Sequence, residues 1–450
     1  MHMHTLLTWA LWSLAIATLG ARAQTHPLPY QAGGQSLGTV NCSSSMCHGS
    51  VVPWKDATVL RNEYTTWSKL DKHSRAYDVL LNATSQRIAK NLGLKEPAHE
   101  AKLCLDCHAH YPTPAQRGNR FLFKEGVSCE ACHGPAGPWI ESHIEKGATH
   151  LRNVAHGLYP LSKPIEQAKL CLSCHIGDAS RFVTHRIMGA GHPRMSFELT
   201  TFTAMGPSHY RMDADYVARK GSNDPVRVWA IGQVLAVQTQ LEALMDPKRN
   251  YDGLFPELVL FDCHACHRPM AEQRWSSRFG TPPGVIRLNQ GHIVMLKTLV
   301  ATFTSHLNGE LDQALSQLNN SLYARAAAGN LSWQDAAKQL HALAGKMLPV
   351  LEKVTLDRHA RMKILLTLVD ESRVHGYADY ANAEQAYMAI VSVSNGLIQD
   401  GTFKLTPEIR SALVELKSSL AQDEKYQAKI FEQRLGTFRH QLAIQTGAPR

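Results

Sequence analysis

Ten cysteines and 24 histidines carry the most distinctive chemistry of this 450-residue chain. The cysteines fall into five pairs, and a histidine directly follows the second cysteine of every pair. Two thiols about one helical turn apart can form thioethers with the two vinyl groups of one haem, while the adjacent imidazole binds the iron. Four pairs have the Cys-x-x-Cys-His spacing that this chemistry needs, and they are Cys104/Cys107-His108, Cys129/Cys132-His133, Cys171/Cys174-His175 and Cys263/Cys266-His267.

The fifth pair has four intervening residues, in the run Cys42-Ser-Ser-Ser-Met-Cys47-His48. We interpret it as a fifth haem site, because two extra residues can loop out without moving Cys47 and His48 relative to the iron. A Cys42–Cys47 disulfide and a haem held by Cys47 alone remain open as alternatives. The sequence therefore predicts five covalently bound haem c groups.

Two other readings of the whole cysteine set are weaker. A disulfide framework suits an even number of cysteines in an exported protein, but it gives no reason for a histidine after every second cysteine. Zinc sites use Cys-x-x-Cys units in pairs, yet they do not require five repeats of Cys-His. Haem attachment explains both features at once.

The other face of each iron needs a second ligand, and histidines are plentiful. Residues 24–289 contain sixteen, of which five follow a cysteine pair. Two histidines on each iron would give low-spin, six-coordinate haems suited to electron transfer. The eleven further histidines of this region are His26, His73, His99, His110, His143, His150, His156, His185, His192, His209 and His264.

Several connecting segments resemble exported multihaem cytochromes c, in particular the family typified by the tetrahaem electron acceptor of hydroxylamine oxidoreductase. The segments are Trp67–Tyr77, Gly126–Pro135 with His143, and Val183–Glu198. The resemblance covers roughly residues 40–290 and implies closely stacked, mostly bis-His haems that pass electrons. It places the distal ligands at His73, His143, His185 and His192, and leaves His150, His156, His110 and His209 as candidates for the fifth position.

His185 and His192 are expected to serve different haems. They are seven residues apart, and the segment Met188-Gly-Ala-Gly191 between them does not favour one shared helical face. His110 lies too close to His108 to reach the far side of the same haem.

The N-terminus carries an export signal by its pattern. Thr5 to Leu19 is apolar, and Ala21-Arg22-Ala23 ends in the small-x-small pattern that signal peptidase cleaves. We expect residues 1–23 to be removed after Ala23 and the mature protein to be periplasmic, without stable membrane insertion. A retained anchor is the alternative, because the segment before the apolar run lacks Lys and Arg.

The net charge of the chain is +9, which could suggest an anionic partner. Five ferric haems with ionised propionates would contribute about −1 each and offset most of that charge. Nucleic-acid binding is therefore not expected.

The predicted fold class is mainly α, with a loop-rich multihaem cytochrome c domain at residues 24–288 and an α-helical bundle domain at residues 289–450. In the first domain, helical spacing predicts one long helix from Pro225 to Met245. In the second, we expect four to six helices, including one that begins at Thr406-Pro407-Glu408 and one that Pro349 kinks. A helical cap over the haems is favoured over a partner-docking module.

The functional prediction is an exported pentahaem cytochrome that transfers electrons between redox partner proteins, with no catalytic residue assigned. The alternative is a multihaem oxidoreductase that acts on a small nitrogen or sulfur compound at one open haem. A subunit of a larger electron-transfer complex is a third possibility. His292, the helical-domain histidine nearest the last haem motif, is the one best placed to reach a haem edge.

Overall fold

The structure is a computed structural model that describes residues 26–55, 57–253, 256–267, 287–328, 333–370 and 375–446. These residues form helices and loops, and their only strand-like pairings are the isolated bridges Ser36 to Arg117 and Phe261 to Leu288. The predicted mainly α fold class is confirmed. The predicted cleavage point after Ala23 lies outside the described residues.

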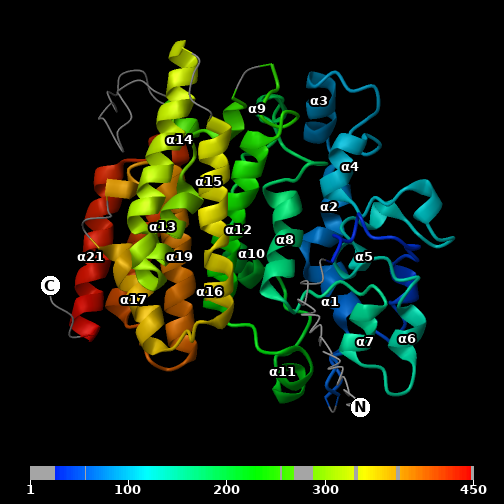
Figure 1. Cartoon of the computed structure of the whole chain (residues 1–450). Helices are drawn as coiled ribbons and strands as arrows, with labels where there is room; N and C mark the ends of the chain where they lie inside the picture. The colour runs from blue at the N-terminus through cyan, green and yellow to red at the C-terminus, as the bar shows by residue number, and fades with distance from the viewer. Residues whose placement is uncertain are drawn as a thin grey trace, which may run out of the picture.

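The first half of the chain consists of short helices joined by long loops (Figure 1). Glycine and proline are frequent between them, and glycines directly follow α5 and α11. The α-helices before residue 224 are α1 (Glu63–Leu70), α2 (Ala76–Val79), α3 (Ala83–Asn91), α4 (Lys102–His108), α5 (Cys129–His133), α6 (Ile140–Ile144), α7 (His150–Ala155), α8 (Pro164–His175), α9 (His185–Gly189), α10 (Leu199–Met205) and α11 (Ala214–Lys220). Four 3-10 turns accompany them, η1 (Thr39–Asn41), η2 (Lys72–Arg75), η3 (Pro114–Gln116) and η4 (Phe123–Glu125).

This half has little apolar core of its own. A separate cluster of buried apolar side chains there has five members, Leu80, Ala89, Ala98, Leu105 and Ala109. A polypeptide region of this length normally buries a much larger core. The deficit is what a region built around large cofactors would show.

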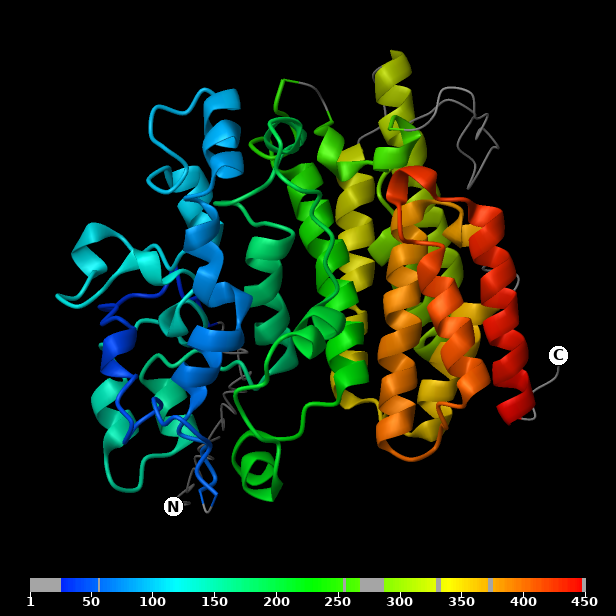
Figure 2. The ribbon, with the colours of Figure 1, turned by 180° about the vertical axis from the view of Figure 1, so that it is seen from behind.

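The long helix α12 (Pro225–Met245) has the bounds that its apolar spacing predicts. The Asp224 carboxylate accepts hydrogen bonds from the Val226 and Arg227 backbone N–H groups and so caps its N-terminus. Figures 1 and 2 show α12 in the middle of the molecule, with α8 on one side and the C-terminal helices on the other. It packs against α8 and also against the C-terminal helices α13, α15 and α19.

The C-terminal part is a helical bundle with more members than the four to six expected. Eight α-helices lie in its described residues: α13 (Gly291–Phe303), α14 (Asn308–Ala328), α15 (Trp333–Gly345), α16 (Met347–Lys353), α17 (Arg358–Val369), α19 (Tyr380–Gln399), α20 (Pro407–Ser418) and α21 (Ala428–Thr446). The bundle also contains η7 (Ser305–Leu307), η8 (His375–Tyr377) and η9 (Asp423–Lys425). The predicted start at Thr406 is confirmed, since its hydroxyl caps the Ile409 N–H. The expected kink at Pro349 is instead a break at Lys346, and Pro349 lies within the first turn of α16, where its missing N–H costs nothing.

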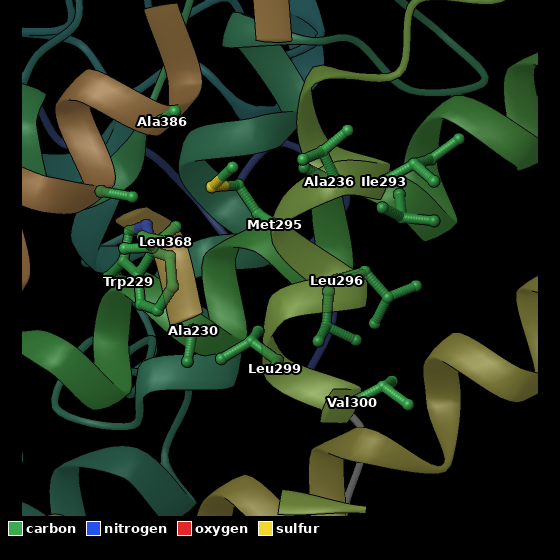
Figure 3. Close-up of a cluster of buried hydrophobic side chains, with 14 of the residues drawn as sticks. Trp229, Ala230, Ala236, Ile293, Met295, Leu296, Leu299, Val300, Leu368 and Ala386 are labelled. Atoms are coloured by element: carbon green, nitrogen blue, oxygen red, sulfur yellow. The ribbon is translucent and has the colours of Figure 1, made fainter. Parts of the chain in front are cut away.

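One large apolar cluster joins α12 to the bundle, as Figure 3 shows. Trp229 of α12, Met295 and Leu299 of α13, and Leu368 of α17 are all fully buried in it. The same cluster includes Ala168 and Leu172 of α8, the helix that carries a Cys-x-x-Cys-His motif. The motif-bearing half is therefore fixed to the bundle through α8 and α12. The domain boundary after residue 288 stays a prediction.

The closest approach of α12 and α19 occurs at Gly396, and it gives a stability prediction. A Cβ atom at this position would lie 2.6 Å from Val226 Cγ2. We expect Gly396→Ala to lower the free energy of unfolding by about 1–3 kcal/mol, because a close-packed interface must move apart. Gly436→Ala in α21 is the matched control, since no atom lies within 4 Å of its built Cβ, and there alanine should raise the melting temperature. Equal changes in melting temperature at the two positions would contradict the packing argument.

None of the helices in the described part of the chain is long and apolar enough to cross a membrane.

Candidate haem sites

Three of the Cys-x-x-Cys-His motifs occupy the last turn of a helix. Helices α4, α5 and α8 each end at the motif histidine, His108, His133 and His175 respectively. A helical turn places the two cysteines of each motif about one turn apart, the separation that two thioethers to one haem require. The motif at Cys263 lies on η6 (Cys263–Ala265), where the His267 N–H donates to the Cys263 carbonyl at 2.8 Å.

The longer Cys42 motif closes in the same way. The His48 N–H donates to the Cys42 carbonyl at 3.1 Å, so the extra residues loop out between the ends of the motif. Gly49 makes room for this loop, because a Cβ there would lie 1.8 Å from the Ser43 carbonyl oxygen. All ten cysteines have free thiols in the structure. The local backbone is therefore consistent with a fifth two-cysteine site.

Four of the five motif histidines face one histidine from elsewhere in the chain. The ring centroids are 6.0 Å apart for His48 and His143, 6.2 Å for His175 and His73, 6.4 Å for His108 and His192, and 6.1 Å for His267 and His185. A metal–imidazole bond of about 2.0 Å and a ring radius of about 1.1 Å place two axial imidazoles of one metal about 6.2 Å apart, centroid to centroid. The observed spacing therefore fits one iron between the rings of each pair.

The hydrogen bonds of these rings also suit iron ligation. The Nδ1 atom lies 2.9 Å from Glu63 Oε2 in His48, 3.0 Å from Asp71 Oδ1 in His73, 3.0 Å from the Ala76 carbonyl in His108, and 2.8 Å from the Pro193 carbonyl in His192. Such bonds fix the tautomer and leave Nε2 for a metal. The two carboxylates are largely sheltered from water. Burial alone raises the pKa of Glu63 and of Asp71, but hydrogen bonds from the histidines and nearby N–H groups outweigh it and lower both values.

Residues 41–134 match the model of a family described as cytochrome c554 and c-prime. The chain is similar to that family over this region. The resemblance to multihaem c-type cytochromes predicted from the sequence is thereby confirmed, and it implies covalent c-type haem and electron transfer. No curated protein and no solved structure matches the chain. The match includes the motifs ending at His48, His108 and His133, whereas those ending at His175 and His267 lie outside it.

The remaining motif, which ends at His133, lies within the matched region, and its histidine has different surroundings from the four paired ones. Burial lowers the pKa of His133 to about 3, and His209 is the charged group with the largest further effect. His209 is itself partly buried near Asp71 and Glu63, and this burial lowers its pKa. Within the described residues no histidine ring packs directly on His133, so this site differs from the four paired ones.

Two of the other candidates for the fifth distal position have partners elsewhere, and a third, His156, is exposed. His110 Nε2 lies 2.9 Å from the Ser36 hydroxyl, and His150 Nε2 lies 3.3 Å from the Ser162 hydroxyl. His292 is buried beneath α12, where its Nδ1 lies 2.8 Å from Gln233 Oε1. It lines an open cavity of about 100 Å³ that also borders His175.

Thiols of different motifs lie next to one another. The Cys42 thiol lies beside that of Cys129, and the Cys107 thiol lies beside that of Cys174, close enough for each pair to affect one another's ionisation. Cys132 is close enough to Cys174 for the two thiols to affect each other's charge. Burial of this cluster raises the pKa of Cys132 to about 12. The motifs that end at His48, His133, His175 and His108 therefore lie next to one another in a series.

A buried carboxylate inside one motif helps to hold this contact, and the sequence reasoning did not find it. Glu130, between Cys129 and Cys132, accepts hydrogen bonds from the backbone N–H groups of Leu37 at 2.8 Å, Gly38 at 2.8 Å and Ala136 at 2.7 Å. The bonds tie the loop before Cys42 to the His133 motif. Burial raises the pKa of Glu130, whereas the hydrogen bonds from these three N–H groups stabilise its ionised form.

The C-terminal helices contact the last motif directly. Arg194 bonds to Glu384 of α19 at 2.9 Å and lies over the Tyr380 ring at 5.1 Å. His264, between Cys263 and Cys266, packs on the same Tyr380 ring at 5.3 Å between centroids. The bundle thus forms one wall of the His267 site, and His264 points to that wall and not to the His267–His185 pair.

Glu63, Asp71 and Asn153 also belong to the candidate sites but were not predicted. The Asn153 side-chain amide lies 3.2 Å from His143 Nδ1. Asp71 is only two residues from His73, and an Asp-x-His pattern beside a candidate ligand could have drawn attention to it. Glu63 is fifteen residues from His48, so no local signal connects them.

Proposed function

We propose that the chain is a pentahaem c-type cytochrome that transfers electrons between redox partner proteins. The observation that carries the proposal is the set of four His–His pairs at the spacing of two axial ligands. In this proposal the ten cysteines are the covalent tethers, and His48, His108, His133, His175 and His267 are the proximal ligands. His143, His192, His73 and His185 are the distal ligands of the His48, His108, His175 and His267 sites.

For the His133 site we infer that His209 supplies the distal ligand. Its electrostatic effect on His133 and its burial beside the His73–Asp71 pair support this assignment. The hydrogen bonds of His110 to Ser36 and of His150 to Ser162 argue against those two competitors.

The contacts between motifs support a serial order of sites. Cys42 lies beside Cys129, Cys132 lies near Cys174, and Cys174 lies beside Cys107. Helix α9 then links the last two sites, because His185 begins it and His192 follows it three residues beyond its end. The order is therefore His48, His133, His175, His108 and His267. Haem supplies one-electron exchange at such sites, and the chain holds the sites in contact.

The remaining chain has supporting roles in this proposal. The bundle packs on α8 and on the His267 motif and so covers the far end of the series. We also propose that residues 1–23 direct export and are removed after Ala23, because c-type haem is attached outside the cytoplasm in this class of protein.

A second function rests on the unusual surrounding of His133. If that site has no distal ligand, a small nitrogen or sulfur compound could bind there, and the protein would be an oxidoreductase. The two functions predict different ligation at one haem only.

Spectroscopy of the purified protein tests the proposal. We expect five haems per chain, low-spin ferric signals in electron paramagnetic resonance, and no absorbance change with nitrite, hydroxylamine or carbon monoxide. One high-spin haem that responds to those compounds would favour the oxidoreductase. A colourless protein, or one with the mass of the bare polypeptide, would exclude both.

A further inference from the structure

Two of the paired histidines differ from the others in what their Nδ1 atom contacts. Glu63 Oε2 lies 2.9 Å from His48 Nδ1, and Asp71 Oδ1 lies 3.0 Å from His73 Nδ1. Both carboxylates are mostly buried, with 18% and 17% of their side chains exposed. Each is also held by a backbone donor, the Arg61 N–H for Glu63 and the His73 N–H for Asp71. The contacts are therefore fixed by the fold and are not chance surface pairs.

The His108 site provides an internal contrast. Both of its rings bond to neutral backbone oxygens, His108 to the Ala76 carbonyl at 3.0 Å and His192 to the Pro193 carbonyl at 2.8 Å. No carboxylate among the described residues bonds to either ring. The His48 and His175 sites thus each have one histidine that bonds to a carboxylate. The two histidines of the neighbouring His108 site bond only to neutral carbonyl groups.

This difference has an electronic consequence for a bound iron. A carboxylate that accepts the Nδ1 proton makes the imidazole a stronger electron donor than a carbonyl does. Stronger donation, together with a nearby negative charge, stabilises ferric iron relative to ferrous iron and lowers the reduction potential.

We propose that Glu63 and Asp71 are positioning residues that lower the reduction potentials of the haems at the His48 and His175 sites relative to the haem at the His108 site. The inference rests on the proposed function, because it needs haem between the paired rings. The His175 and His108 motifs touch through Cys174 and Cys107. An electron shared between these neighbours therefore resides mainly on the His108 side, toward the His267 site.

Redox potentiometry of the haem-loaded full chain tests this inference. Glu63→Gln and Asp71→Asn remove the charge and keep the side-chain shape. We expect each substitution to raise one of the five midpoint potentials by about 59 mV. This shift corresponds to a roughly tenfold larger equilibrium constant for the one-electron reduction of that haem. The haem whose midpoint potential rises in Glu63→Gln should be the haem that becomes high-spin in His143→Ala. Likewise, the haem whose midpoint potential rises in Asp71→Asn should be the one that becomes high-spin in His73→Ala.

Glu125→Gln is the matched control. The Glu125 carboxylate accepts a hydrogen bond from the Thr39 hydroxyl at 2.6 Å and acts electrostatically on Cys42. Among the described residues it does not bond to a paired histidine. We expect a clearly smaller shift there. Equal shifts in Glu125→Gln and Glu63→Gln, or no shift in either Glu63→Gln or Asp71→Asn, would overturn the inference. If Glu63→Gln fails to incorporate five haems, Asp71→Asn decides the question alone.

The two levels of the proposal fail in different ways. If the protein has five low-spin haems and neither substitution changes a midpoint potential, the electron-transfer function stands and only the effect of the two carboxylates on the potentials is refuted. Histidine variants that produce no high-spin signal would instead refute the ligand pairs themselves.

Discussion

Replacing Cys42 and Cys47 together by serine should remove one haem in five from the purified protein. The His48 N–H to Cys42 carbonyl bond closes this motif as the corresponding bond closes the regular motif at Cys263. We therefore expect both thiols to belong to one attachment site. Haem content per chain and intact mass measure the loss, and the Cys104→Ser/Cys107→Ser double substitution should give the same loss at a regular motif.

The single substitutions separate the alternatives for this motif. If both cysteines are tethers, Cys42→Ser alone should leave a haem with one thioether, whose absorbance maximum is displaced. If Cys47 alone holds the haem, Cys42→Ser should change neither the content nor the spectrum. A protein with four haems before any substitution would show that the pair is a disulfide.

His209→Ala should convert one of the five haems to a high-spin form that binds carbon monoxide. The assignment of His209 to the His133 site predicts this, since His209 has the largest electrostatic effect on His133 after burial, and the other two histidines that affect it, His48 and His143, face each other. Electron paramagnetic resonance and the carbon monoxide difference spectrum measure the change. His110→Ala is the control, because His110 bonds to Ser36 and its removal should leave all five haems low-spin.

The same measurement decides between carrier and oxidoreductase. A wild-type protein that already has one high-spin haem, unchanged by His209→Ala, would show that the His133 site is open. A wild-type protein with five low-spin haems that stay low-spin in His209→Ala would mean that another residue completes this site.

Much of the helical architecture could be read from local pattern. The bounds of α12 followed from apolar spacing between Asp224 and Asp246, and the start of α20 followed from Thr406 and Pro407. The number of helices in the bundle was underestimated, in part because Pro349 was expected to kink one helix, whereas the chain forms two helices with a break after Gly345. The position of α12 between the motif-bearing half and the bundle was also not predicted, since its apolar residues surround the whole helix and do not indicate which neighbours cover them.

The sequence by itself predicts where haem is attached. The chemistry of thioethers and a proximal imidazole is local, so it must be encoded within five to seven consecutive residues, as at Cys104–His108 and Cys42–His48. The tertiary structure decided which imidazoles face one another, as His73 and His175 do across about a hundred residues of chain. It also decided which of them, such as His48 with Glu63, has a carboxylate behind it. Contacts of this kind depend on where separate helices and loops pack, and no spacing along the chain specifies that.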